Sequence, residues 1–189
     1  MNRTLIATVA DRPGVLNRVA SLFRRRAFNI ESLTVGHTER EGISRMTIVV
    51  DGHRTDSEKV AQNLEKLVDV LLVEDVTDRS AILHDLVLIK VQIHDRAARS
   101  EILRITDTFQ ARLVDMCPRT AIVEIAGSES KIRTVIEALR SHGILEMVRT
   151  GCVAMVRGGL KNGNANETPS LNSSHASDIN TEGGNSWQE

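Results

Sequence analysis

The first part of the chain carries two hydrophobic periodicities, one after the other. A compact apolar run over residues 4–10 predicts a strand, which ends at a turn rich in Asp, Pro and Gly. From Val15 onward the apolar residues fall three and four positions apart, which predicts a helix whose one buried face consists of Leu16, Val19, Leu22 and Phe23. The helix ends in three arginines, residues 24–26, which are typical of a solvated last turn or, alternatively, of a patch that binds a partner.

The next segment continues with two strands, a helix and a further strand. Residues 29–37 and 43–50 predict strands that are joined by a short polar turn containing Gly. A capping-box pattern at residues 55–58 precedes a second helix. The apolar face of that helix consists of Val60, Leu64, Leu67 and Val68. An apolar strand over residues 70–76 completes the order β-α-β-β-α-β.

The same order of elements starts again in the second half of the chain. A strand over residues 86–93 precedes an amphipathic helix that opens near Asp95, and two short strands follow within residues 113–125. Ser128 is placed to cap the next helix, and residues 144–156 predict one closing strand. The apolar faces of the two helices consist of Ile102, Ile105, Thr106 and Phe109, and of Ile132, Val135, Ile136 and Leu139.

These elements predict an α+β protein made of two ferredoxin-like βαββαβ units, each an antiparallel sheet with both helices on one face. We therefore expect domains at residues 1–78 and 79–158. The polar tail at residues 159–189 has too few apolar residues to repay its ordering entropy, and we expect it to be disordered. Exposed sheet edges pair readily, so two copies of the first domain are expected to form a twofold dimer with one continuous sheet.

Composition and charge exclude several classes of function. The 189 residues carry a formal net charge of −1 and contain no Tyr, so the chain lacks the basic surface and aromatic platforms of RNA-recognition modules with this element order. No apolar run approaches the ~20 residues that cross a bilayer, and residues 1–4 lead into the first predicted strand without a small-residue cleavage site. We expect no nucleic-acid partner, no membrane partner and a cytoplasmic location.

The sequence contains no catalytic or metal-binding constellation. Phosphate-binding glycine loops, nucleophile elbows and paired His-Glu or Cys-x-x-Cys motifs are all missing. The six histidines are scattered without ligand spacing and are expected to be solvated. Cys117 and Cys152 are too isolated for a disulfide framework and are expected to be small packing residues. We therefore expect no catalytic residue, no metal site and no cofactor on this chain.

One turn, between the first strand and the first helix, has a chemical mechanism. It combines an acidic side chain with unpaired N–H groups at a helix N-terminus, which is an anion site. Gly14 has no Cβ to block approach, so a carboxylate could reach the N–H groups of Gly14, Val15 and Leu16. Asp11 would face an ammonium group, and the pair of interactions would recognise an α-amino acid.

Two residues at the start of the next strand add to this candidate site. Asn29 offers a carbonyl and an amide to the same ligand, and Ile30 could line a side-chain pocket together with Val15 and Leu16. The alternative interpretation is an ordinary strand-to-helix turn in which Asp11 satisfies its own backbone.

The turn at residues 11–16 on a βαββαβ unit resembles the ACT domain, a regulatory module that binds amino acids between domains. Three further segments, residues 28–35, 44–49 and 66–70, closely resemble the small subunit of acetolactate synthase. The similarity extends over roughly residues 2–158 and includes the second unit.

That resemblance implies a non-catalytic regulatory subunit. Such a subunit binds the thiamine-diphosphate-dependent catalytic subunit, activates it, and carries feedback inhibition by valine, or by leucine or isoleucine. Thiamine diphosphate, magnesium and FAD are then expected only on the catalytic partner. In the family the effector lies at the interface of two N-terminal domains. Its contacts map onto Asp11, Gly14, Val15, Leu16, Asn29 and Ile30.

Two features qualify this implication. Many family members have Asn where this chain has Asp11, which keeps an acceptor for the ammonium group but loses an amide donor for the carboxylate. In the second unit the equivalent loop, residues 93–97, lacks the Pro-Gly pair, so we expect dimer contacts and packing there rather than a second ligand site. The alternative function is a free-standing ACT-domain sensor that acts on another enzyme or on transcription.

Overall fold

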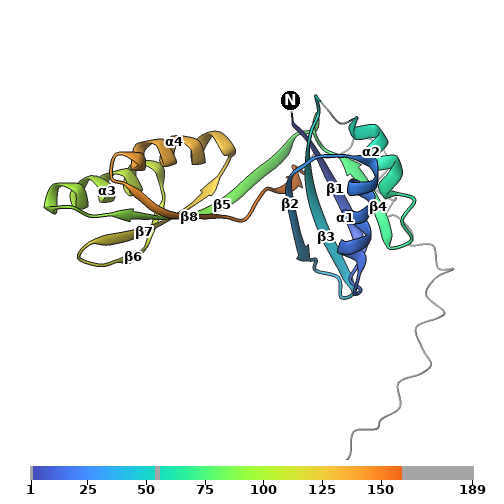
Figure 1. Ribbon diagram of the computed structural model, residues 1–189, viewed down its shortest axis with the longest axis horizontal. Helices are drawn as coiled ribbons and strands as arrows, with labels where there is room; N and C mark the ends of the chain where they lie inside the picture. The colour runs from blue at the N-terminus through green and yellow to red at the C-terminus, as the bar shows by residue number, and fades with distance from the viewer. Residues whose placement is uncertain (1, 54–55, 159–189) are drawn as a thin grey trace, which may run out of the picture. The chain divides into compact units, whose positions relative to one another are not determined.

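The first unit is a four-stranded antiparallel sheet with two helices on one face (Figure 1). The computed structural model describes residues 2–53 and 56–158. The elements of this unit are β1 (Asn2–Ala10), α1 (Val15–Arg26), β2 (Ile30–His37), β3 (Ile43–Asp51), α2 (Ser57–Leu64) and β4 (Val70–Asp75). The strand order β2-β3-β1-β4 places β1 and β3 in the middle and leaves β2 and β4 as the edges.

The core of the first unit lies between the sheet and its helices. Alternate residues of β1, namely Leu5, Ala7 and Val9, are buried against Val19 and Phe23 of α1. This arrangement follows from the period of two in a strand and of 3.6 in a helix, which bring the apolar residues of each element to one face. It confirms the buried face predicted for the first helix at Val19, Leu22 and Phe23. The prediction that Leu16 belongs to that face is wrong, because Leu16 is exposed and Val15 is buried in its place.

The second helix begins and ends at different residues from those predicted. Its N-cap is Asp56, whose side chain accepts hydrogen bonds from the N–H groups of Glu58 and Lys59. Thr55, the first residue of the predicted capping box, lies outside the described residues. Because α2 ends at Leu64, the prediction that Val68 belongs to its buried face is wrong, and Val68 is 87% exposed.

The second unit repeats the topology of the first. Its elements are β5 (Ala81–Gln92), α3 (Arg96–Phe109), β6 (Arg112–Met116), β7 (Thr120–Gly127), α4 (Glu129–Arg140) and β8 (Ile144–Arg149), with strand order β6-β7-β5-β8. The predicted cap at Ser128 is confirmed, because its side chain accepts a hydrogen bond from the N–H of Lys131. The helix predicted to open near Asp95 does so, and Asp95 caps it by accepting the N–H of Ala98. The structure therefore has the α+β fold of two ferredoxin-like units. No helix in the described ranges is long and apolar enough to cross a bilayer.

The prediction of one closing strand over residues 144–156 is wrong. β8 ends at Arg149, and β9 (Val153–Val156) begins only after a bend at Gly151, whose φ is +89°. β9 pairs with residues 81–84 of β5, whereas β8 pairs with the later part of the same strand. β5 is therefore longer than predicted and runs from a two-stranded ribbon with β9 into the second sheet.

The ribbon of β9 and residues 81–84 packs on the face of the first sheet that the helices leave open. Ile6 of β1 is buried there in a small apolar cluster with Val76 and Ala154. Arg45 of β3 donates a hydrogen bond from Nη2 to the carbonyl oxygen of Ala154 at 2.9 Å. The first sheet is thus covered on both faces along part of its length, which the hydrophobic pattern alone did not predict.

Two predictions about single residues are also wrong. Cys117 is exposed in the turn between β6 and β7 and is not a packing residue. His142 is buried rather than solvated, and its Nε2 lies 3.7 Å from the carboxylate of Glu101 on α3. Cys152, in contrast, is partly buried, and that burial, together with the charge of Asp85, raises the pKa of its thiol to about 11. The predicted disordered tail lies outside the described residues.

Candidate functional site

The turn between β1 and α1 leaves the N-terminus of α1 without a side-chain cap. Its N-cap residue is Gly14, and the first turn of the helix contains no acidic side chain. The other three helices of the described ranges are capped by the side chains of Asp56, Asp95 and Ser128. Apart from the N–H of Val15, which donates to the carbonyl oxygen of Arg12, the backbone N–H groups at the start of α1 are therefore available to an anion from outside the chain.

Gly14 suits this turn because of its backbone conformation. Its φ of +87° lies in the left-handed region, which other residues adopt only with strain. A Cβ at Gly14 would meet Nη1 of Arg18 at 3.6 Å, which is an ordinary contact. A small substituent at Gly14 would therefore suffer from strain more than from crowding, and the turn has room beside it.

Arg18 places a guanidinium group beside this turn, and the sequence reasoning missed it. Its Nη2 lies 2.6 Å from Oδ2 of Asp69, a buried carboxylate. Because Arg18 follows Gly14 by four positions, the two residues occupy the same face of the helix. That spacing was visible in the sequence and could have identified Arg18 as a further group for a carboxylate ligand.

The residues predicted in the turn itself have different environments. Asp11 is exposed, and its Oδ2 lies 3.1 Å from Nδ1 of His37, at the end of β2. Val15 is buried in the core, and its N–H already contacts the carbonyl oxygen of Arg12 at 3.3 Å. Leu16 is exposed. Leu16, rather than Val15, is therefore the exposed apolar side chain of this turn.

Asn29 and Ile30 lie at the other end of the sheet from the turn. Ile30 begins β2 and pairs with Val50, whereas His37 ends β2 beside Asp11. Seven steps along an extended strand separate residues 30 and 37, which is about 23 Å. Asn29 donates from Nδ2 to Oε1 of Glu31 at 2.6 Å. Within one chain, the two groups of predicted residues therefore cannot contact the same small ligand.

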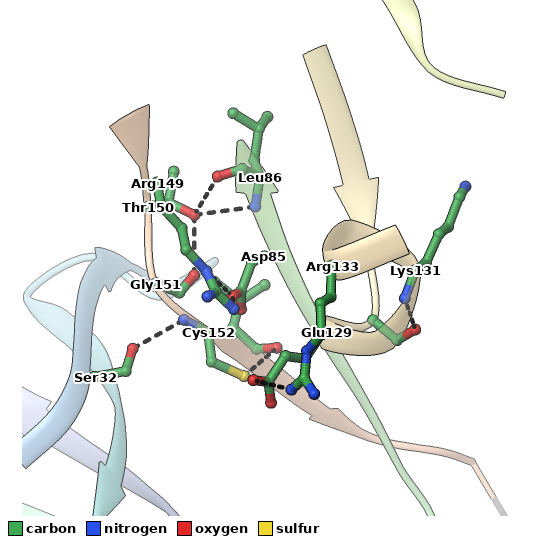
Figure 2. A network of polar contacts seen from close by, with 12 residues as sticks. Ser32, Asp85, Leu86, Glu129, Lys131, Arg133, Arg149, Thr150, Gly151 and Cys152 are labelled. Atoms are coloured by element: carbon green, nitrogen blue, oxygen red, sulfur yellow. Dashed lines mark hydrogen bonds and ion pairs between the residues drawn. The ribbon is translucent and has the colours of Figure 1, made fainter. Parts of the chain in front are cut away.

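Two hollows lie on the face of the first sheet that α1 and α2 do not cover. The larger, about 710 Å³, is lined by Ser32, Asp85, Arg149 and Cys152 among others, and Figure 2 shows the polar contacts at its wall. The smaller, about 310 Å³, lies between β2, β3 and the ribbon and includes Arg45. Neither hollow is lined by any of the six predicted residues.

Comparison with known proteins extends over both units. The sequence matches the AHAS small subunit-like ACT domain over residues 5–72 and the small subunit of acetolactate synthase over residues 84–158. It is 46% identical over 149 residues to the acetolactate synthase small subunit of Aquifex aeolicus, covering 79% of this chain and 78% of that protein. It is 42% identical over 172 residues to the Bacillus subtilis small subunit, covering 90% and 99%.

A solved structure gives the same result in three dimensions. The crystal structure of the acetolactate synthase small subunit from Thermotoga maritima matches this chain with a TM-score of 0.77 at 34% identity. The match covers 85% of this chain and 99% of that one, so it includes both ferredoxin-like units. The chain therefore belongs to the acetolactate synthase small subunit family, a family of regulatory subunits.

Proposed function

We propose that this chain activates the thiamine-diphosphate-dependent catalytic subunit of acetolactate synthase and inhibits it when valine, or another branched-chain amino acid, is bound. Family membership supports the catalytic partner. A single observation supports the effector proposal: the N-terminus of α1 has no side-chain cap. Its N-cap residue is Gly14, and the guanidinium group of Arg18 lies next to it. Thiamine diphosphate, magnesium and FAD are proposed to bind the catalytic partner alone.

A second copy of the chain would complete the effector site. β2 is an edge strand, so the backbone groups along its outer side have no partner strand within the described chain. If two β2 strands pair antiparallel about a twofold axis, residue 30 of one copy lies opposite residue 37 of the other. Because His37 contacts Asp11, Asn29 and Ile30 of the partner subunit would then lie beside the turn. This argument supports a homodimer through the first domain, residues 1–78.

The proposed site has a separate group for each part of an α-amino acid. The carboxylate binds the N–H groups at the start of α1 and the guanidinium of Arg18. The ammonium group faces Asp11, which lies on the same turn. Leu16 and Ile30 of the partner subunit contact the branched apolar side chain, and Asn29 of the partner subunit adds a polar contact.

Reconstitution tests this proposal. Acetolactate formation is measured with the matching catalytic subunit alone, with this chain added, and with this chain and valine. The rate is expected to rise on addition of the chain and to fall on addition of valine. A chain that leaves the rate unchanged would overturn the regulatory proposal.

A pair of variants then tests the effector site. Gly14→Asp places an anion where the carboxylate binds, and should raise the valine concentration for half-inhibition by about tenfold or more while activation remains. Gly143→Asp is the matched control, because Gly143 also has a positive φ, +77°, but lies in the second unit. If the two variants require the same valine concentration for half-inhibition, the α1 turn is not the effector site.

A further inference from the structure

The segment that joins β8 to β9 makes a direct polar contact with β2. The N–H of Cys152 donates to Oγ of Ser32 at 3.0 Å, and Figure 2 shows this bond between the two segments. The bond is partly buried and joins residues 120 positions apart. One side chain of β2 therefore fixes the position of the backbone that leads out of the second sheet.

Gly151 packs against the same strand more closely than any residue with a Cβ could. A Cβ built at Gly151 would lie 2.7 Å from Oγ of Ser32 and 3.0 Å from Oγ1 of Thr34. Thr34 Oγ1 is buried and makes no hydrogen bond among the described residues, so this part of the contact is steric. At the point of contact, a displacement of β2 toward the joining segment would press these two oxygens against the backbone of Gly151.

On its other side, the joining segment is held firmly to β5 of the second sheet. Arg149 donates from Nε to Oδ2 of the buried Asp85 at 2.5 Å, and Thr150 Oγ1 accepts the N–H of Leu86 at 3.1 Å (Figure 2). Breaking this ion pair would leave the buried carboxylate of Asp85 without a compensating charge, which is destabilising. The joining segment is therefore expected to move together with the second sheet.

On the first-unit side, Ser32 is two residues along β2 from Ile30. The intervening Glu31 accepts the side-chain hydrogen bond of Asn29. No loop separates residues 29 and 32, although the pairing of β2 with β3 shifts register between Ile30 and Ser32. A ligand that moves the start of β2 would therefore act on Ser32 through this short bulge. The proposed effector residues and the contact with Gly151 thus lie on one continuous piece of backbone.

We propose that Ser32 and Gly151 are positioning residues for regulation, and that their contact couples effector binding on β2 to the placement of the second unit. This inference rests on the proposed function. Allosteric regulation is a coupling free energy between two sites, and it needs an element that both sites bias. Loosening the contact should therefore lower the response to valine without lowering the affinity for valine.

The first test uses Ser32→Ala in the full chain, which removes only the acceptor of the Cys152 hydrogen bond. Valine binding to the isolated chain is measured by calorimetry, and activation and inhibition are measured with the catalytic subunit. Binding and activation are expected to stay within about twofold of wild type. The inhibition ratio is the rate without valine divided by the rate at saturating valine. Because one hydrogen bond is lost, this ratio is expected to fall by about fivefold, or to one where the wild-type ratio is smaller than that.

The second test inserts a methyl group into the contact and includes a matched control. Gly151→Ala places a Cβ against Ser32 at a φ of +89°, whereas Gly143→Ala imposes similar backbone strain at +77° with its nearest neighbour 3.8 Å away. Gly151→Ala is expected to lower the inhibition ratio, and Gly143→Ala to leave it unchanged.

The possible outcomes separate this inference from the proposed function. A wild-type chain with no valine response overturns both. If Ser32→Ala and Gly151→Ala are inhibited by valine as strongly as the wild-type chain, the coupling role alone is overturned and the effector site stays in place. If the two variants lose valine binding together with inhibition, the residues belong to the effector site, and the coupling role is again overturned.

Discussion

The choice of β2 as the dimer edge leads to a quantitative prediction at Val35. This residue lies near the end of β2 and is 42% exposed, although its neighbour across the strand pair is the buried Met46. A second β2 strand would cover the exposed part. Substituting Val35→Asp would place two carboxylates, one from each copy, within the proposed interface.

The size of the effect follows from the exposed area. Fully burying a Val side chain contributes about 2 kcal/mol, so covering the exposed 42% of Val35 contributes about 1 kcal/mol per copy. The twofold axis doubles this to about 2 kcal/mol for the dimer, which is about thirtyfold in the dissociation constant. Val35→Asp loses at least this much, because the two carboxylates also repel and must be desolvated.

Sedimentation equilibrium measures the dimer dissociation constant directly. The control is Leu72→Asp on β4, at the opposite edge of the same sheet, because Leu72 is 44% exposed and would suffer the same intrinsic loss on becoming Asp. The dissociation constant is expected to rise by about thirtyfold or more for Val35→Asp and to change little for Leu72→Asp. The reverse pattern would place the interface at β4 and separate Asn29 from the turn in the dimer.

Three further predictions concern single residues. Burial raises the pKa of Asp75, but hydrogen bonds from Thr77 and Ser57 and the charge of Arg3 together lower it below its usual value. A lowered carboxylate pKa adds stability above the unfolded pKa, so the destabilisation by Asp75→Asn, measured by urea unfolding, should be largest at pH 7 and shrink below about pH 4. Burial raises the pKa of Cys152 from 9.0 to about 11, so at pH 8 the fraction of its thiolate is about a hundredfold smaller than for an unperturbed thiol. Mass spectrometry should therefore find that iodoacetamide labels the exposed Cys117 before Cys152, and equal labelling rates would contradict this. Asp95→Ala removes the cap of α3 and should lower the free energy of unfolding by about 1 kcal/mol, whereas Asp95→Asn should retain most of it.

Most of the fold could be predicted from the sequence because each element keeps one hydrophobic period from end to end. Caps at Asp95 and Ser128 were visible because they directly precede an apolar helical pattern. The break between β8 and β9 was not visible, because residues 144–156 read as one apolar strand and pairing partners are non-local. Gly151, with a φ of +89°, was the local sign of the bend, whereas its close approach to β2 is a non-local contact that the sequence does not reveal.

The candidate site was harder to predict because its geometry depends on sheet register. The βαββαβ order already places the start and the end of β2 at opposite ends of the sheet, so the distance from Asn29 to Asp11 follows from topology once the register is known. The contact of Asp11 with His37 depends on which strand end meets the turn, and no local pattern contains that information. Arg18, in contrast, was within reach of helical spacing from Gly14.

The two units share a topology but differ at the start of their first helix. In α1 the N-cap is Gly14, which has no side chain to offer, and in α3 it is Asp95, which accepts the N–H of Ala98 at 2.7 Å. A carboxylate at this position satisfies the free donor and repels an incoming anion, so it occupies the place that a ligand carboxylate would take. The missing Pro-Gly pair of the second unit signals this difference, and the side chain of Asp95 supplies its physical cause. A duplicated unit can thus keep its sheet and core while one cap residue decides whether the helix end is open to a ligand.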